Sequence, residues 1–307
     1  MRYRFQPWQL AVLVIALSGG ALLFAHWRAS RELSPLRLVQ YLPPDRAAHV
    51  YIDVAALRGI GLLDMLAGSK AEEEMDYRHF VEQTGFDYRT DLDAVAGAFL
   101  HGDAYMVLRG HFDWKRLKEY ALAQGGMCRN TVCAMPGSSA ERHISFYPIR
   151  TDVLALAVSK EERGVDMISA DQWKNPPPLP PEPVWISVPS YMFTDVSSMP
   201  AGTHSFLTPL ALAQQVTFAI GQLGPRFQLR AEVVCASPQA AADLASQLTT
   251  TTDLLRKMIT REHMTPSPRD LSGVLVAGSF DHRERNVTGI WPVERSAIEA
   301  LASGQPQ

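Results

Sequence analysis

The pattern closest to catalytic chemistry is a His-x-Asp motif that occurs twice, as His101-Gly-Asp103 and His111-Phe-Asp113. A histidine beside a carboxylate can bind zinc or transfer protons. The intervening residues 104–109 are predicted as a strand, which at ~3.3 Å per residue holds the motifs about 20 Å apart. The two motifs then cannot share a metal ion. We interpret the first as a hairpin turn and Asp113 as a helix N-cap.

The other polar clusters predict no active site. Asp281-His-Arg-Glu284 joins two predicted strands and is interpreted as a solvated turn, and Ser138 and Ser139 near His143 lack the turn and the acid of a hydrolase triad. No His-Glu-x-x-His, Walker A, Rossmann or Cys-x-x-Cys motif occurs in the sequence. We therefore predict no catalytic residue, no cofactor and no metal ion, and we favour a non-enzymatic protein.

The chain has three cysteines, of which Cys128 and Cys133 are five positions apart. A metal clip would need further ligands, and a redox pair usually has two intervening residues. A structural disulfide in an oxidising compartment is the favoured reading. Cys235, in an apolar strand, is predicted to be a buried core residue.

An apolar segment spans residues 8–27, with a tryptophan at each end. As a helix rising ~1.5 Å per residue it just crosses a hydrocarbon core of roughly 30 Å. We predict a transmembrane anchor in contact with the lipid bilayer, a cytoplasmic tail over residues 1–7 and a stalk over residues 28–40. The aromatic ends favour an anchor that is retained over a cleaved signal peptide. The protein is then a single-pass inner-membrane protein whose globular part is periplasmic or extracellular.

The charge balance argues against one class of partner. With 29 Lys and Arg against 32 Asp and Glu, the net charge is -3. A nucleic-acid-binding protein needs a basic stripe or patch. Nucleic acid is therefore not predicted as a partner.

The globular part is organised as four repeats of strand, turn, strand and helix. The predicted strand pairs cover residues 95–100 and 104–109, 143–148 and 153–158, 215–220 and 227–235, and 273–280 and 285–290. Helices are expected from Asp113, from a capping box of Ser159 and Glu162, after Ser237, and over residues 294–302.

A proline-rich segment, residues 175–183, divides these units two and two and is interpreted as an extended linker. Leading strands are expected at residues 50–54 and 184–188. The predicted fold class is α+β. It has two ferredoxin-like halves, residues 41–174 and 184–307, each an antiparallel sheet with helices on one face.

One loop region is unusually apolar and contains Tyr191, Met192, Phe193 and Phe206. If exposed, these residues would form a surface for a partner or a lipid. If buried, they would cover the sheet of the second half, which is the favoured reading.

Several short motifs carry a resemblance: Leu42-Pro-Pro-Asp45, Thr84-Gly-Phe-Asp87 with Asp91-Leu-Asp93, and Gly110-His-Phe-Asp-Trp114. Together with the anchor, they resemble a loose group of single-anchor bacterial envelope proteins without a known activity. The likeness covers the first half, to about Asp166, and implies location and architecture only.

Three functional hypotheses follow. The leading one is a non-enzymatic binding or scaffold protein with an envelope protein as its partner. The second is an assembly-platform component of a pilus or secretion machine, although Pro35 leaves no room for the coiled coil that such proteins often carry. The third is an external hydrolase whose site is built from residues scattered along the chain.

Overall fold

The computed structural model describes residues 33–44, 46–64, 75–194, 204–224, 226–261 and 271–302. The predicted tail, the predicted anchor over residues 8–27 and the first part of the predicted stalk lie outside these ranges. Within them, no helix is both long enough and apolar enough to span a membrane.

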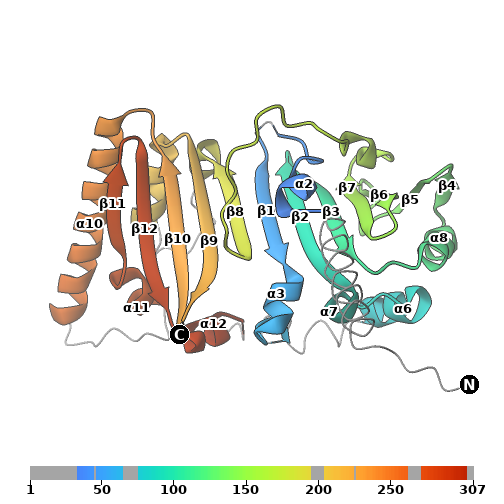
Figure 1. Ribbon diagram of the computed structural model, residues 1–307, viewed down its shortest axis with the longest axis horizontal. Coiled ribbons are helices and arrows are strands. Elements are labelled where there is room, and N and C mark those ends of the chain that lie inside the picture. The colour runs from blue at the N-terminus through green and yellow to red at the C-terminus, as the bar shows by residue number, and fades with distance from the viewer. Residues whose placement is uncertain are drawn as a thin grey trace, which may run out of the picture.

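The described strands form one antiparallel sheet of twelve strands in the order β11-β12-β10-β9-β8-β1-β2-β3-β7-β6-β5-β4 (Figure 1). The strands are β1 (Ala48–Asp53), β2 (Leu92–Leu100), β3 (Asp103–Gly110), β4 (Met127–Arg129), β5 (Val132–Pro136), β6 (His143–Arg150), β7 (Val153–Ser159), β8 (Val184–Pro189), β9 (Gln215–Leu223), β10 (Arg226–Val234), β11 (Ser279–Arg283) and β12 (Asn286–Val293). The coarse prediction of an α+β fold with antiparallel strands is confirmed.

The described α-helices are α2 (Pro35–Val39), α3 (Val54–Gly59), α6 (Met75–Thr84), α7 (Tyr88–Asp91), α8 (Trp114–Ala123), α9 (His204–Leu207), α10 (Pro238–Arg261), α11 (Leu271–Val276) and α12 (Arg295–Ala302). Three 3-10 turns are η1 (Gly164–Met167), η2 (Ser190–Phe193) and η4 (Thr208–Leu212). In Figure 1, α10 borders the sheet beside β11, at the opposite end from α6 and α8.

The strand order repeats outward from the central pair of β1 and β8. In one direction it reads β1-β2-β3-β7-β6, and in the other β8-β9-β10-β12-β11. Each half is therefore a leading strand followed by two hairpins, whereas a ferredoxin-like unit has the element order βαββαβ. The prediction of two ferredoxin-like halves is corrected: the two halves share one continuous sheet, because β1 pairs with β8.

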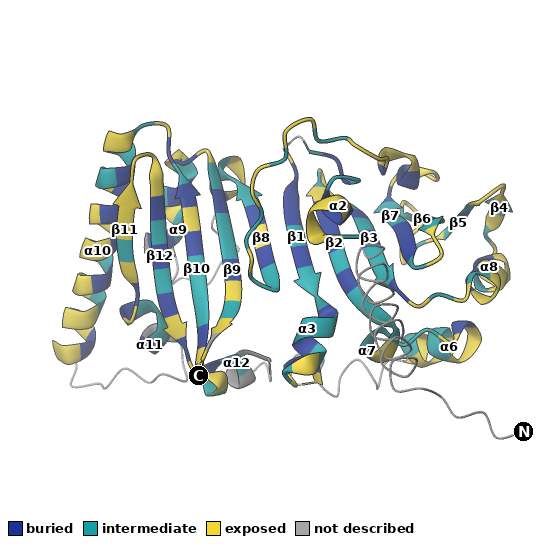
Figure 2. Cartoon of the chain, viewed as in Figure 1, coloured by how far each residue is buried: buried dark blue, intermediate teal, exposed yellow. Residues whose placement is uncertain are grey.

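The two faces of the sheet differ in what covers them, and Figure 2 marks the buried, intermediate and exposed residues along the strands. We call the face that carries Trp185, Thr217 and Glu232 the front face. In the first half α2 and η1 cover it, and Leu38 and Val165 are buried there. The opposite face packs against α3, α8, α10 and α12. The expectation of helices on one face is thus wrong for the first half, which is covered on both faces.

The turn and the helix caps predicted from short sequence motifs are present in the structure. His101 and Gly102 have φ of 51° and 86°, as a tight hairpin turn between β2 and β3 requires. The Asp113 side chain caps α8 by accepting from the amides of Lys115 and Arg116, each at 3.1 Å. The Ser237 hydroxyl caps α10 by accepting from an amide at 3.1 Å.

Two predicted elements are wrong. The hydroxyl of Ser159 donates to the carbonyl of Glu161 at 2.8 Å, so the expected capping box does not form and only η1 follows. Residues 273–276, predicted as strand, belong to α11. A run of Gly-Val-Leu-Val fits either a helix or a strand, because its apolar residues show no period.

The end of the predicted stalk lies inside the fold. Leu38 and Val39 in α2 are 0% and 1% exposed and pack in the core of the first half. The Arg109 side chain donates to the carbonyl of Leu33 at 3.1 Å. The stalk boundary at residue 40 is therefore corrected to a position before α2.

Candidate functional site: a polar groove across the second half

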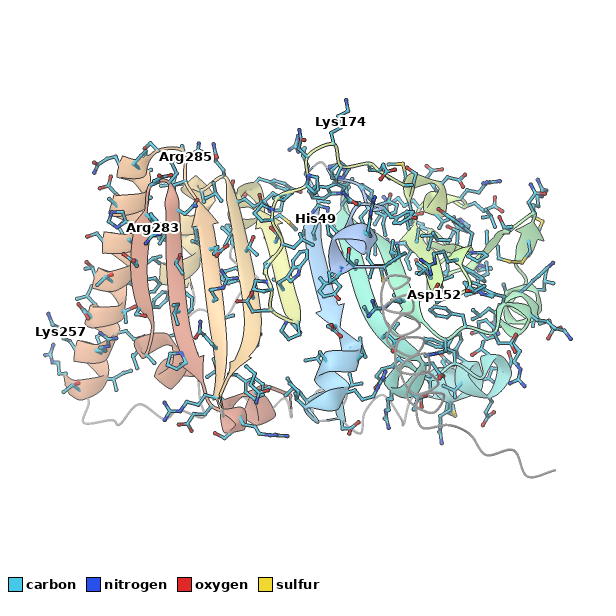
Figure 3. The ribbon with its side chains drawn as sticks, in the orientation of Figure 1. His49, Asp152, Lys174, Lys257, Arg283 and Arg285 are labelled. Atoms are coloured by element: carbon cyan, nitrogen blue, oxygen red, sulfur yellow. A yellow bond between two sulfur atoms is a disulfide. The ribbon has the colours of Figure 1, made fainter. Side chains whose placement is uncertain are left out.

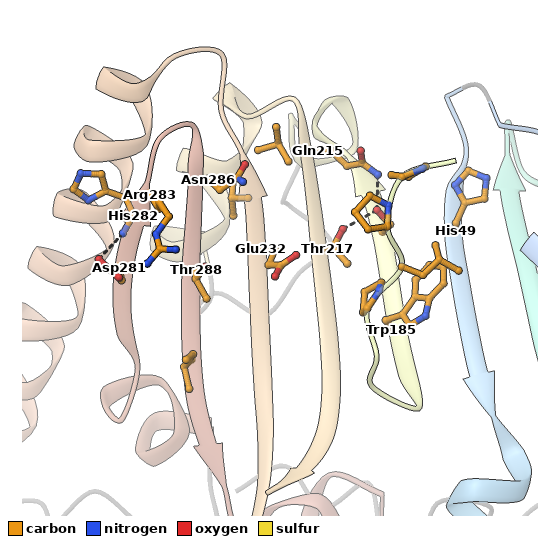
Figure 4. A pocket seen from close by; sticks show the side chains of 18 of the residues that line it. His49, Trp185, Gln215, Thr217, Glu232, Asp281, His282, Arg283, Asn286 and Thr288 are labelled. Atoms are coloured by element: carbon orange, nitrogen blue, oxygen red, sulfur yellow. Dashed lines mark hydrogen bonds between the residues drawn. The ribbon is translucent and has the colours of Figure 1, made fainter. Parts of the chain in front are cut away.

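The front face of the second half carries a row of polar side chains that runs across the strands. Strand register places six residues side by side in the order Asp281, Thr288, Glu232, Thr217, Ser187 and His49. Neighbouring strands are ~4.8 Å apart, so the row is roughly 24 Å long. We call this row and the side chains beside it the front-face groove (Figure 4).

The groove opens into a cavity of about 630 Å³. Its floor is β8, β9, β10, β12 and β11. Its wall toward the first half is Trp173 with residues 177–180 of the proline-rich segment. The site therefore combines polar and apolar side chains in the lining of one cavity, as ligand-binding clefts do.

His49 closes the inner end of the groove and is 4% exposed. Its Nε2 lies 2.8 Å from the carbonyl oxygen of Pro43, which can only accept, so Nε2 carries the proton and Nδ1 is left as an acceptor. Trp173 packs edge-on against the ring at 4.9 Å between centroids. Burial lowers the pKa of His49, which keeps the imidazole neutral at physiological pH.

Next to His49 the floor is a hydroxyl and amide network. Ser187 Oγ and Thr217 Oγ1 are 2.8 Å apart, and Gln215 Nε2 donates to Ser187 Oγ at 2.6 Å. Trp185 is 2% exposed, and its buried Nε1 has no hydrogen-bond acceptor among the described residues. An unpaired buried donor costs free energy, so this indole is a group that a ligand or water could satisfy.

An ion pair fixes the proline-rich segment over the floor. Arg230 Nε and Nη2 donate to the two carboxylate oxygens of Glu182 at 2.6 and 2.7 Å, and Arg230 also pairs with Glu232. The bidentate bond to Arg230 lowers the pKa of Glu182. This clamp sets the position of the wall relative to the row.

We expect Glu182→Gln to weaken this clamp. The free energy of unfolding of the variant should also fall less than that of the wild type when the pH is lowered. Because the folded pKa of Glu182 is depressed, its contribution is present above the ordinary glutamate pKa of about 4.3 and is lost as pH falls through the folded pKa. The loss at pH 7 should be about 1 kcal/mol or less, since the pair is partly solvated. Urea unfolding at pH 7 and pH 3 measures both effects. Glu141→Gln, at an exposed turn, is the control, and equal behaviour of the two variants would contradict the assignment.

The outer end of the groove is open. Arg283, Asn286 and Thr288 make no side-chain hydrogen bond within the described part of the chain, and Figure 4 shows them along β11 and β12. Arg283 and Asn286 are directly opposite each other across the two strands. In Figure 3 Arg283 lies toward the α10 end of the sheet and His49 at the boundary between the halves. These polar groups are free to contact a ligand.

His49 and the acids of the groove do not converge. His49 and Glu232 are three strands apart, about 14 Å, and Asp281 is two strands further. No group of three or more histidine, cysteine or acidic residues in the described ranges could hold a metal ion. The two His-x-Asp motifs lie at opposite ends of β3, as predicted, and Asp103 pairs with Arg142 at 3.4 Å. The arrangement suits binding better than acid-base catalysis.

The structure contains a disulfide between Cys128 and Cys133, which face each other across β4 and β5. Cys235 is buried and free, and burial raises the pKa of its thiol. The bond lies at the end of the sheet farthest from the groove.

The apolar loop residues do not form one exposed patch. Phe193 and Phe206 are 6% and 7% exposed and pack in the core beneath β9 and β10, as the favoured reading expects, so these two do not belong to a partner surface. Tyr191 and Met192 are about 40% exposed, and the Tyr191 hydroxyl donates to the carbonyl of Arg46 at 2.6 Å.

The sequence analysis did not assign a binding role to Thr217, Glu232 or Thr288. The sequence feature that could have located them is the alternation of polar and apolar residues along Gln215–Leu223, Arg226–Val234 and Asn286–Val293. Alternation predicts that one face of a sheet is exposed. Which polar residues become neighbours depends on the order and register of strands far apart in sequence.

No protein-family model and no curated protein sequence matches the chain. The fold has solved counterparts. The structure titled "Structure of crystal form I of TP0453" is similar with a TM-score of 0.52 and 12% identity, over 89% of this chain and 98% of that chain. Crystal form III of the same protein gives a TM-score of 0.50 and 12% identity, over 89% and 99%. At this identity the likeness shows the fold, across both halves, and no function.

Proposed function

We propose that the protein is a non-enzymatic binding protein, anchored in the inner membrane by residues 8–27, whose ligand in the envelope lies in the front-face groove. The observation that carries the proposal is the cross-strand polar row with its open outer end. A sheet face without a ligand is either exposed to solvent along its whole width or covered by helices and loops. Here a polar floor meets an apolar wall clamped in place by Arg230 and Glu182.

Binding is favoured over hydrolysis on geometric grounds. A hydrolase would bring an acid and a base, or a nucleophile and a base, within reach of one bond. In the groove the Nε2 of His49 is bonded to a backbone carbonyl, and Glu232 pairs with Arg230. No second function has an observation of its own in its favour.

The external location is supported by two features. Residues 8–27 have the length, apolar character and aromatic ends of a membrane helix. The disulfide between Cys128 and Cys133 is typical of a compartment outside the cytosol.

A photo-crosslinking amino acid at Thr288 tests the proposed site. We expect irradiation of intact cells to give a discrete adduct at residue 288 and none at Lys118, an exposed position on α8 on the other face of the sheet. Mass spectrometry of the isolated adducts identifies the bound material. Absence of an adduct at 288, or the same pattern at 288 and 118, would refute the groove as the binding site.

A further inference from the structure

We infer that the front-face groove binds an extended, β-1,4-linked glycan that lies across the strands. The inference rests on the proposed function and specifies the class of ligand. It replaces the envelope protein expected from the sequence as the partner of this site.

The spacing of the row is the first argument. One polar side chain per strand gives a contact every ~4.8 Å from Asp281 to His49. A pyranose residue in an extended β-1,4-linked chain advances by about this spacing, so each sugar can contact one strand. An extended peptide advances only ~3.3 Å per residue, so along this path its residues would fall out of step with the row.

The chemistry of the floor is the second argument. Hydroxyls and carboxamides of Ser187, Gln215, Thr217, Asn286 and Thr288 are both donors and acceptors, and so are sugar hydroxyls. The backbone groups of β9, β10 and β12 are already paired with strands on both sides. Among the described strands along the groove, only the terminal strand β11 has an edge without a partner strand, so a peptide main chain lying across β9, β10 and β12 has no strand edge to pair with. A ligand recognised by side chains needs no such edge.

The inner end supplies the third argument. The Trp185 Nε1–H is a buried donor without an acceptor, and His49 Nδ1 is left as an acceptor. Trp173 and the proline rings of residues 177–180 form an apolar wall beside them. A sugar ring fits this combination of polar groups and an apolar wall. Its C–H groups can pack on the wall, and the hydroxyls along its rim can bond to the polar groups.

The test is isothermal titration calorimetry of the full chain, purified in detergent micelles, with chitohexaose and cellohexaose as probes. We expect saturable binding of at least one of them and none of maltohexaose, whose α-linkages coil the chain. Thr288→Trp should weaken binding at least tenfold because the indole fills the floor. Thr250→Trp, at an exposed position on α10, should leave binding unchanged.

Trp185→Phe separates ligand binding from folding. The smaller ring leaves a cavity in the core, so we expect a modest loss of thermal stability in a chain that still folds, while the affinity of the folded chain for the bound hexasaccharide falls about threefold or more. Failure of both β-linked probes to bind a folded chain, or equal affinities of Thr288→Trp and Thr250→Trp, would overturn the glycan assignment. If residue 288 then crosslinks a protein, the groove remains a binding site and only the ligand class is wrong. If it crosslinks nothing, both proposals fail.

Discussion

Leu248→Asp is expected to unfold the second half of the sheet. Leu248 is 5% exposed on α10 and packs in the core that contains Val216, Val233 and Val287 from three neighbouring strands. An aspartate there would bury a carboxylate without a partner and remove a large apolar side chain. Together these should cost about 4 to 5 kcal/mol or more, a large share of the 5 to 15 kcal/mol that holds a typical domain.

Leu254→Asp on the same helix is the matched control, because Leu254 is 55% exposed. Circular dichroism melting of the two full-length variants measures the difference. We expect Leu254→Asp to melt within a few degrees of the wild type and Leu248→Asp to show no cooperative transition at the wild-type temperature. Similar melting of both would contradict the placement of α10 on the sheet.

The shared sheet extends the consequence to the first half. β8 pairs with β1, so loss of the second half would expose the edge of β1 and the side chains of Tyr51 and Trp185, which stack at 5.9 Å. Limited proteolysis of Leu248→Asp should therefore cut β1 as well as the second half. Two independent sheets, as the sequence suggested, would confine the damage to residues 184–307.

Local signals predicted much of this fold. The turn at His101 and Gly102, the caps at Asp113 and Ser237, and the alternating strands of the third hairpin each depend on a few adjacent residues. The topology was not predictable in the same way. Two duplicated halves are compatible with two sheets or with one, and the choice rests on four residue pairs between β1 and β8.

The front-face groove could not be predicted from the sequence for a related reason. Its row combines residues from six strands that range from position 49 to position 288. Five of the strands contribute an ordinary serine, threonine, glutamate or aspartate and β1 contributes His49, so no spacing in the sequence marks them. The His-x-Asp motifs, which did stand out, have structural roles: the first forms a hairpin turn and the second caps a helix.

Two of the motifs that carry the resemblance to envelope proteins, within residues 84–93 and 110–114, also have structural roles, and they meet at one place. Asp87 caps α7 by accepting from the amide of Arg89 at 2.9 Å, and Asp91 accepts from the amide of Asp87 at 2.8 Å. Phe86 stacks on Phe112 at 5.2 Å between ring centroids. These contacts join the segment before β2 to the end of β3, which explains why the resemblance implies architecture without activity.

Gly110→Ala at this junction is expected to be strongly destabilising. A Cβ at Gly110 would lie 2.2 Å from the backbone oxygen of Asp91 and 3.1 Å from the Cα of Leu92. The same Asp91 oxygen accepts from the amide of His111 at 2.7 Å, and the Gly110 amide donates to Asp152 at 3.0 Å, so neither backbone can move away without breaking a hydrogen bond. We expect a loss of roughly 2 to 3 kcal/mol, by analogy with overpacked cores.

Gly59→Ala is the matched control for this change. Gly59 is exposed at the end of α3, and a Cβ there meets no atom within 4 Å. Alanine at such a position should stabilise the protein by about 0.4 to 1 kcal/mol, because it restricts the unfolded chain. Urea unfolding should therefore move the two midpoints in opposite directions. A Gly110→Ala midpoint at or above the wild-type value would show that the close approach of β3 to Asp91 is not a constraint on the fold.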